Sequence, residues 1–216
     1  MRTLLIGGGH SAYFAANAIR EIDPNGKFII IEFTSEKVDV LSKMFPFAEI
    51  IRLDIDEVEE YIRGNGSILD AVIAATESDS LNLRYCKVAK ENAIPLTIPI
   101  INNPLNTEIF LSEGITYMIN PYNLIPRELS EILDVNANVL CRLHRTGLLM
   151  ASIKISNEEF LLKLRREIAQ SRDLSAIFVS RSGEMTNSAE EAGLGGRAYV
   201  IGSEEKVEKI LKIARR

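Results

Sequence analysis

The sequence has 216 residues, of which 46% are hydrophobic and 25% are charged, enough to bury the core of one large or two small domains. Its net charge of −5 excludes the basic character that would indicate nucleic-acid binding. No apolar run approaches the roughly 18 residues that span a bilayer, and the N-terminus leads into a predicted strand instead of a signal peptide, so we expect a cytoplasmic protein.

The charge is distributed unevenly along the chain. Residues 1–133 carry a net charge of −8, whereas residues 134–216 carry +3. The difference fits two units of opposite charge that attract one another between subunits, and it fits equally two solvated surfaces of different composition.

The first predicted element is a strand at residues 4–6, which runs into three consecutive glycines and then a helix. The spacing Gly7-x-Gly9-x-x-Ala12 matches the dinucleotide-binding fingerprint with alanine in the third place. Gly7 would allow the tight turn, Gly9 would let a pyrophosphate approach the backbone, and Ala12 would let the helix pack closely on the strand. The unpaired amides at the start of that helix favour an anion.

A second predicted strand, residues 28–31, ends in Glu32, about 20 residues after the fingerprint, where such folds place the acid that binds the ribose hydroxyls. Because Glu32 would repel a 2′-phosphate and Phe33 supplies no positive charge, NAD(H) or an adenine nucleotide is favoured over NADP(H). His10 and Ser11 complete the predicted binding turn, in which a protonated His10 would assist a phosphate or would simply be exposed. The alternative is an ordinary glycine turn.

Strands and helices continue to alternate up to residue 133. The predicted strands are residues 48–53, 71–75, 95–101 and 115–119. The predicted helices are a segment through residues 38–44, a short segment around residues 58–62, residues 80–92, a segment around 109–111, and residues 124–133. Asp54 follows one of these strands and Thr76 follows another, at the edge where nucleotide-binding sheets place their ligands. Each is equally well explained as a residue that stabilises the start of the next helix.

Six strands alternating with helices predict a Rossmann-like, doubly wound parallel α/β sheet over residues 1–133. The pattern then changes to a smaller α+β domain, residues 139–216, after a linker at residues 134–138. The predicted strands of this second domain are residues 139–143, 149–155, 176–180 and 197–201, and its helices are residues 158–168 and 204–214.

Six segments together resemble the RCK/KTN regulatory proteins of Trk and Ktr potassium uptake systems, over nearly the whole chain. They are LLIGGGHSA, FIIIE, LDID, DAVIAATESDSLNL, INNPLN and GGRAYVIGSEEKVEKI. The resemblance implies an N-domain that binds NAD(H), ATP or ADP and a small C-terminal ligand-sensing domain. It also implies assembly into dimers and octameric rings beneath a membrane-embedded cation-translocating subunit. The binding positions that match the family pattern are Gly7, Gly9, Ala12, Glu32, Asp54 and Thr76.

The sequence also departs from the family pattern. His10 stands where an arginine is common, Leu53 replaces a glycine, no arginine precedes Asn102, and Gly196 replaces an aspartate. The missing arginine counts against recognition of a triphosphate, because a fixed guanidinium is a strong partner for the outer phosphate.

The predicted function is regulatory and not catalytic, because we find no candidate for the acid/base residue that hydride transfer requires. Nucleotide binding would rearrange a ring of subunits, and that movement would gate a membrane transporter of potassium or another cation. Residues 124–133 are the candidate crossover helix between subunits. The alternatives are a small NAD-dependent oxidoreductase and a scaffold that binds no nucleotide. A basic set in the second domain is either an anion or subunit surface or a solvated face: Arg142, His144, Arg145, Arg165 and Arg166.

Overall fold

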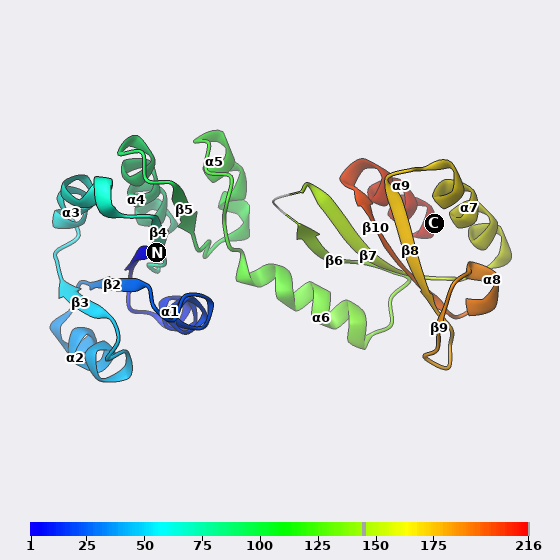
Figure 1. Ribbon diagram of the computed structural model, residues 1–216, viewed down its shortest axis with the longest axis horizontal. Helices are drawn as coiled ribbons and strands as arrows, with labels where there is room; N and C mark the ends of the chain where they lie inside the picture. Colours follow the sequence, from blue (N-terminus) through cyan, green and yellow to red (C-terminus); the bar gives the residue numbers. More distant parts are fainter. Residues whose placement is uncertain (144–145, 216) are drawn as a thin grey trace. The chain divides into compact units, whose positions relative to one another are not determined.

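The computed structural model describes residues 1–143 and 146–215, which divide into two compact units (Figure 1). The first unit is Met1–Tyr122 and the second is Asn123–Arg216. Among the described residues, none of the helices has the length and apolar character needed to cross a bilayer.

The first unit is built on a parallel five-stranded sheet with the order β3-β2-β1-β4-β5. Its strands are β1 (Arg2–Ile6), β2 (Lys27–Glu32), β3 (Glu49–Arg52), β4 (Ala71–Ala74) and β5 (Leu96–Pro99). The chain builds outward from β1 to β3 on one side and then returns to add β4 and β5 on the other. The order therefore reverses between β1 and β4, and a Rossmann-like sheet binds its ligand at the carboxyl ends of the strands at such a point.

Helices cover both faces of this sheet, which is why its central strands are apolar on both sides. On one face, α1 (His10–Ile22) and α2 (Ser35–Met44) pack on the strands through Ala12, Ala16 and Leu41. The second face is covered by α3 (Glu57–Asn65), α4 (Asp79–Glu91) and α5 (Thr107–Ser112). The short helical turns are η1 (Gly66–Ile68), η2 (Pro104–Asn106) and η3 (Pro121–Asn123).

The prediction of a sixth strand at residues 115–119 is wrong, because only an isolated parallel bridge between Ile100 and Ile119 forms there. The Ile119 amide donates to the Pro99 carbonyl, and the Ile101 amide donates to the Ile119 carbonyl. The next bond of a parallel ladder would need an amide hydrogen at position 99 to reach Tyr117. Proline has none, so the ladder stops after one bridge.

The second unit consists of α6 (Leu124–Ile132) and an antiparallel sheet with the order β6-β7-β10-β8-β9. Its strands are β6 (Ala137–Leu143), β7 (Leu148–Lys154), β8 (Leu174–Val179), β9 (Met185–Thr186) and β10 (Arg197–Ser203). The core of this unit lies between the sheet and α7 (Glu158–Gln170), α8 (Ala189–Ala192) and α9 (Glu204–Ala214). The predicted smaller α+β domain is thus observed, although β9 and α8 were not predicted.

The unit boundary lies earlier in the chain than the predicted linker at residues 134–138. Arg127 of α6 donates to the carbonyl of Leu140 in β6, and the Asn138 side chain donates to the carbonyl of Arg127. These bonds place α6 with the second unit, whereas the sequence prediction grouped it with the first. Strand β6 also begins at Ala137, within the predicted linker.

Candidate functional site

The turn after β1 follows a path that only glycine permits. Gly7 has φ +114°, and a Cβ atom there would lie 2.6 Å from the carbonyl oxygen of Ala75, just beyond β4. The Gly7 amide donates to the Ile31 carbonyl of β2 at 2.8 Å. The turn therefore lies between the ends of β2 and β4, at the point where the strand order reverses.

Helix α1 begins directly after this turn without a side-chain cap. Gly9 is its N-cap residue and the first turn contains no acid. The first backbone bond runs from the Tyr13 amide to the Gly9 carbonyl, so the amides of His10, Ser11 and Ala12 have no acceptor within the described part of the chain. By contrast, Ser78 caps α4. Unpaired amides and the positive end of the helix dipole make the start of α1 suitable for an anion.

Glu32 stands at the end of β2 and is only 2% exposed. Its Oε1 atom accepts hydrogen bonds from the amide and hydroxyl of Thr34, at 3.1 and 3.2 Å. The other carboxylate oxygen, Oε2, lies beside Gly8, where an added Cβ would overlap it and would approach Leu41 Cδ1 to 2.8 Å. Gly8 is the unspecified position of the fingerprint, yet it makes the space that Glu32 occupies.

These groups line a cleft of 260 Å³ at the carboxyl ends of the strands. Of the predicted binding residues, the cleft brings together Gly7, Gly9, Glu32 and Thr76. Its remaining lining residues are Gly8, Phe33, Lys37, Ile55, Glu77, Ser78 and Leu81. The arrangement offers backbone amides, a carboxylate and apolar side chains within one cleft, which matches the needs of a phosphate, a sugar and a base.

A second hollow of 400 Å³ adjoins the first and shares Gly8, Gly9, Lys37 and Glu77 with it. It extends between α1 and α2 over apolar side chains that include Tyr13 and Met44. His10 is exposed and lines this second hollow, whereas Ser11 is half-buried and lines neither.

Asp54 lies outside the lining of both hollows. Its side chain is 68% exposed and pairs with Arg52 at 3.1 Å, and its amide donates to Glu57 Oε2 at 2.7 Å. The observed role of Asp54 is therefore in the turn before α3, and its contact with a ligand stays a prediction. Ile55, the next residue, is the one that lines the cleft.

Thr76 is 7% exposed and its polar groups are engaged within the protein. Its hydroxyl donates to Asn82 Oδ1 at 2.7 Å, and its amide donates to the same oxygen at 2.9 Å. The Asn82 amide group in turn donates to the carbonyls of Thr76 and Ile100. Asn82 is fully buried in α4 and fixes the turn that forms one wall of the cleft.

Asp79, at the start of α4, joins this turn to the segment after β5. Its carboxylate accepts from the amides of Asn102 and Asn103, and from the side chains of Asn102 and Asn106. Burial raises the pKa of Asp79, but these hydrogen bonds outweigh burial and hold the pKa below its usual value. The two most specific segments of the family pattern, DAVIAATESDSLNL and INNPLN, are thus bonded to each other. The roles of Asn82 and Asp79 were not predicted from the sequence. For Asn82 the available signal was an asparagine at a helix position that the apolar spacing would place in the core.

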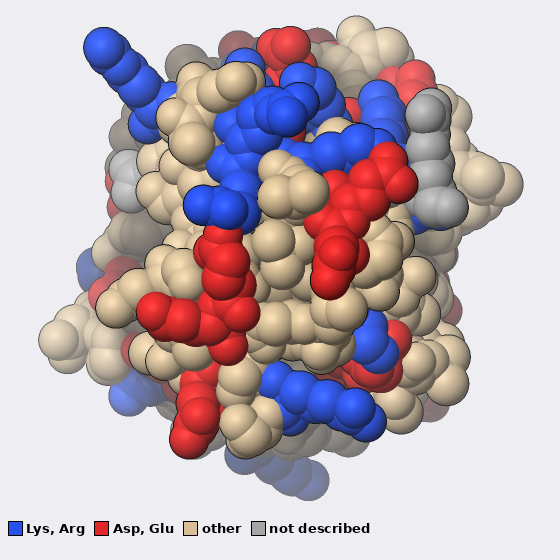
Figure 2. Space-filling view, turned by 90° about the vertical axis from the view of Figure 1, so that its right-hand side faces the viewer, with Lys and Arg blue, Asp and Glu red and all other residues tan. Residues whose placement is uncertain are grey.

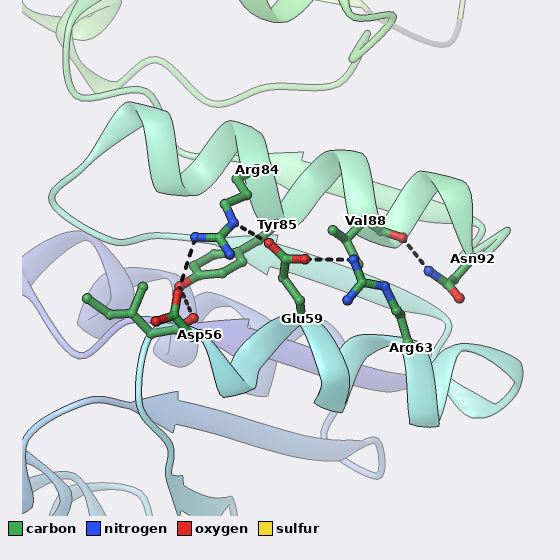
Figure 3. Close-up of polar contacts among 8 residues, drawn as sticks. Asp56, Glu59, Arg63, Arg84, Tyr85, Val88 and Asn92 are labelled. Atoms are coloured by element: carbon green, nitrogen blue, oxygen red, sulfur yellow. Dashed lines mark hydrogen bonds and ion pairs between the residues drawn. The ribbon is translucent and has the colours of Figure 1, made fainter.

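A set of ion pairs joins α3 and the residue before it to α4 (Figure 3). Glu59 lies between Arg63 and Arg84, and Arg84 also reaches Asp56 at 3.6 Å. The Tyr85 hydroxyl donates to the carbonyl of Ile55 at 3.1 Å, which holds the cleft-lining segment against α4. Burial raises the pKa of Tyr85 to about 12, so the hydroxyl stays protonated as this bond requires.

The basic residues of the second unit are interleaved with acids. In Figure 2, which faces the side of Figure 1 that carries α7 to α9, acidic side chains lie directly beside the lysines and arginines. Arg142 pairs with Glu204 and Arg165 pairs with Glu190. His144 and Arg145 lie outside the described residues. The ion pairs support the interpretation of this surface as a solvated face.

A parallel sheet whose order reverses at a glycine turn, an uncapped helix start and a buried acid after the second strand together define the Rossmann-like class of nucleotide-binding domains. Residues 3–121 match the family model described as the TrkA-N domain. The chain therefore belongs to the TrkA-N family, which confirms the resemblance to RCK-type regulatory proteins of potassium uptake systems.

Two curated relatives are both named Trk system potassium uptake protein TrkA homolog. The Archaeoglobus fulgidus protein is 22% identical over 99% of this chain, which corresponds to 49% of its own length. The Methanothermobacter thermautotrophicus protein is 38% identical over 68 residues, or 32% of this chain and 30% of its own length. This chain thus spans about half the length of the first relative.

Two solved structures share the fold. The RCK domain of GsuK superimposes with a TM-score of 0.57 over all of this chain and 48% of its own, at 14% identity. The GsuK channel bound to NAD superimposes with a TM-score of 0.59 over 99% of this chain and 39% of its own, at 15% identity. At these identities the likeness establishes the fold, and both units are covered by it.

Proposed function

We propose that this chain is a nucleotide-sensing regulatory subunit of a potassium or other cation transport system. The carrying observation is that Gly9, the N-cap residue of the uncapped helix α1, and the carboxylate of Glu32 line one cleft. The amides bind the diphosphate of a nucleotide, and Glu32 accepts hydrogen bonds from its ribose. The names of the curated relatives, which are potassium uptake proteins, support the physiological setting.

The proposed ligand is NAD(H) or an adenine nucleotide. The fingerprint and the buried carboxylate of Glu32 both support it, because a carboxylate that lines this cleft would accept hydrogen bonds from ribose hydroxyls and would repel the 2′-phosphate of NADP(H). A structure of the GsuK channel, whose fold this chain shares, contains NAD. Contacts of Asp54, Thr76, His10 and Ser11 with the ligand remain predictions.

In this proposal the protein acts as a homo-oligomer, from a dimer to an octameric ring. It associates from the cytoplasm with a membrane-embedded cation-translocating subunit. Helix α6 and its C-cap residue support the assembly, because their large apolar side chains remain at least half exposed within the chain: Leu124, Ile125, Leu129, Ile132 and Leu133. A ligand changes the ring only if it binds the two ring shapes with different affinity, and the change in shape gates the partner.

Equilibrium dialysis with NAD, NADH, ADP and ATP tests the binding step. Gly9→Asp is the informative variant. Gly9 has φ −80° and its added Cβ would meet only the side chain of Glu77, with Oε1 at 3.4 Å, so we expect the domain to fold. The new carboxylate would then lie against the phosphates. Gly64→Asp, at an open position of α3, is the matched control. We expect the parent protein and Gly64→Asp to bind and Gly9→Asp to lose binding. No binding of any of the four ligands at millimolar concentration would overturn the proposal.

The competing function is a small NAD-dependent oxidoreductase. Incubation of the purified protein with NADH and a panel of carbonyl substrates separates the two, because a regulator binds NADH without consuming it. Cation flux in vesicles that contain the membrane subunit, measured with and without this protein and its nucleotide, tests the gating step. Light scattering on the purified protein tests its oligomeric state.

A further inference from the structure

Lys37 lies where the two hollows beside the glycine turn meet. The hollows share four lining residues, namely Gly8, Gly9, Lys37 and Glu77. Two of these belong to the turn itself, whereas Lys37 comes from α2 and Glu77 from the segment after β4. Lys37 therefore presents a long cationic side chain to the same space as Gly9, the N-cap residue of α1.

The stability of α2 does not explain a lysine at this position. Lys37 is the third residue of α2, near the positive end of the helix dipole, where a cation is disfavoured. Lys43 occupies the last turn of the same helix, where the dipole favours it. Lys37 is also exposed, and no carboxylate in the part of the chain that the structure describes forms an ion pair with it.

The charges around the glycine turn require a cation if a diphosphate binds there. The lining of the two hollows contains three carboxylates, Glu32, Glu36 and Glu77, against His10 and Lys37. Two of them reach the turn itself: Glu32 Oε2 lies beside Gly8, and Glu77 Oε1 lies 3.4 Å from the position of a Cβ on Gly9. Of the two basic residues, Lys37 lines both hollows, whereas His10 lines only the second.

We propose that the ammonium group of Lys37 binds the diphosphate of the nucleotide and offsets the repulsion from Glu77 and Glu36. This inference rests on the proposed function and deepens it, since it names a cationic contact that the fingerprint does not contain. The α1 amides and Lys37 then contact the phosphates from two different elements, α1 and α2.

Calorimetric titrations of ADP, NAD, NADP and adenosine test this inference on the parent protein, Lys37→Gln, Lys37→Arg and the control Lys43→Gln. We expect Lys37→Gln to weaken ADP and NAD about tenfold to a hundredfold, the range of a charge-assisted contact, and to leave adenosine unchanged. Lys37→Arg retains most of the affinity. Lys43→Gln, exposed on the same helix, binds as the parent does. The ADP affinity of Lys37→Gln also becomes less sensitive to salt.

The outcomes separate this inference from the proposed function. If Lys37→Gln binds ADP as tightly as the parent, the inference is wrong and the proposed function stands. Equal losses for adenosine and ADP, or a loss confined to NADP, would each overturn the assignment to the diphosphate. If the parent binds none of the nucleotides, the proposed function fails and this inference fails with it.

Discussion

Replacing Gly8 with alanine separates the geometry of the glycine turn from its stability. An added Cβ would overlap the Oε2 atom of Glu32 and would lie 2.8 Å from Leu41 Cδ1. Both atoms are at the ends of side chains that can shift, so we expect the free energy of unfolding to fall by about 1–2 kcal/mol, at the low end for overpacking. Glu32, which is 2% exposed and bonded to Thr34, would have to leave its position.

The binding consequence of Gly8→Ala is larger than the stability consequence. Loss of the ribose contacts of Glu32 removes hydrogen bonds to a charged group, worth about 1.5–3 kcal/mol, or roughly tenfold to a hundredfold in affinity. Adenosine should be weakened as much as ADP, because the loss is at the sugar. Gly64→Ala, at an open position of α3 outside both hollows, is the matched control. Urea unfolding measures the change in free energy of unfolding, and calorimetry measures the change in affinity. A Gly8→Ala protein with parental affinity for adenosine and ADP would refute the binding of the ribose by Glu32.

Three further variants test other parts of the site. Asn82→Ala removes a fully buried amide that bonds Thr76 and Ile100, and we expect urea unfolding to show a loss of about 2–4 kcal/mol, against little change for the exposed control Asn17→Ala. Hydrogen bonds hold the pKa of Asp79 below its usual 3.8, so the ionised carboxylate stabilises the fold above that pH and this stabilisation is lost as the pH falls below it. The difference in free energy of unfolding between the parent and Asp79→Asn should therefore shrink in acid, and a constant difference would contradict this role of Asp79. Glu77→Gln removes a negative charge beside Gly9 and should tighten ADP binding about threefold to tenfold in calorimetry, whereas weaker binding would show that Glu77 contacts the ligand favourably.

Local sequence pattern was sufficient for most elements of the first unit. The apolar runs of β1, β2 and β4 and the helical spacing in α1 and α4 depend on residues close in sequence, and each was predicted within a few positions. The glycine spacing likewise located the turn, because a backbone with positive φ at Gly7 needs glycine regardless of its neighbours.

The features that were missed depend on partners distant in the chain. The segment at residues 115–119 looks like a strand locally, but its pairing fails at Pro99. The need for Gly8 arises from the side chain of Glu32, and the role of Asn82 arises from Ile100. The start of α6 carries no local signal that it would pack with β6. Sequence spacing therefore located the glycine turn, and the structure was needed to find the side chains that support it.

A titration of the isotope-labelled protein with ADP, followed through its backbone amide resonances, tests the central claim most directly. If the start of α1 holds the diphosphate, the amides of Gly9, His10, Ser11 and Ala12 should show the largest saturable shifts, accompanied by those of Glu32 and Thr34. Saturable ADP shifts confined to other parts of the chain, or no shift at the start of α1 at saturating ADP, would contradict the account.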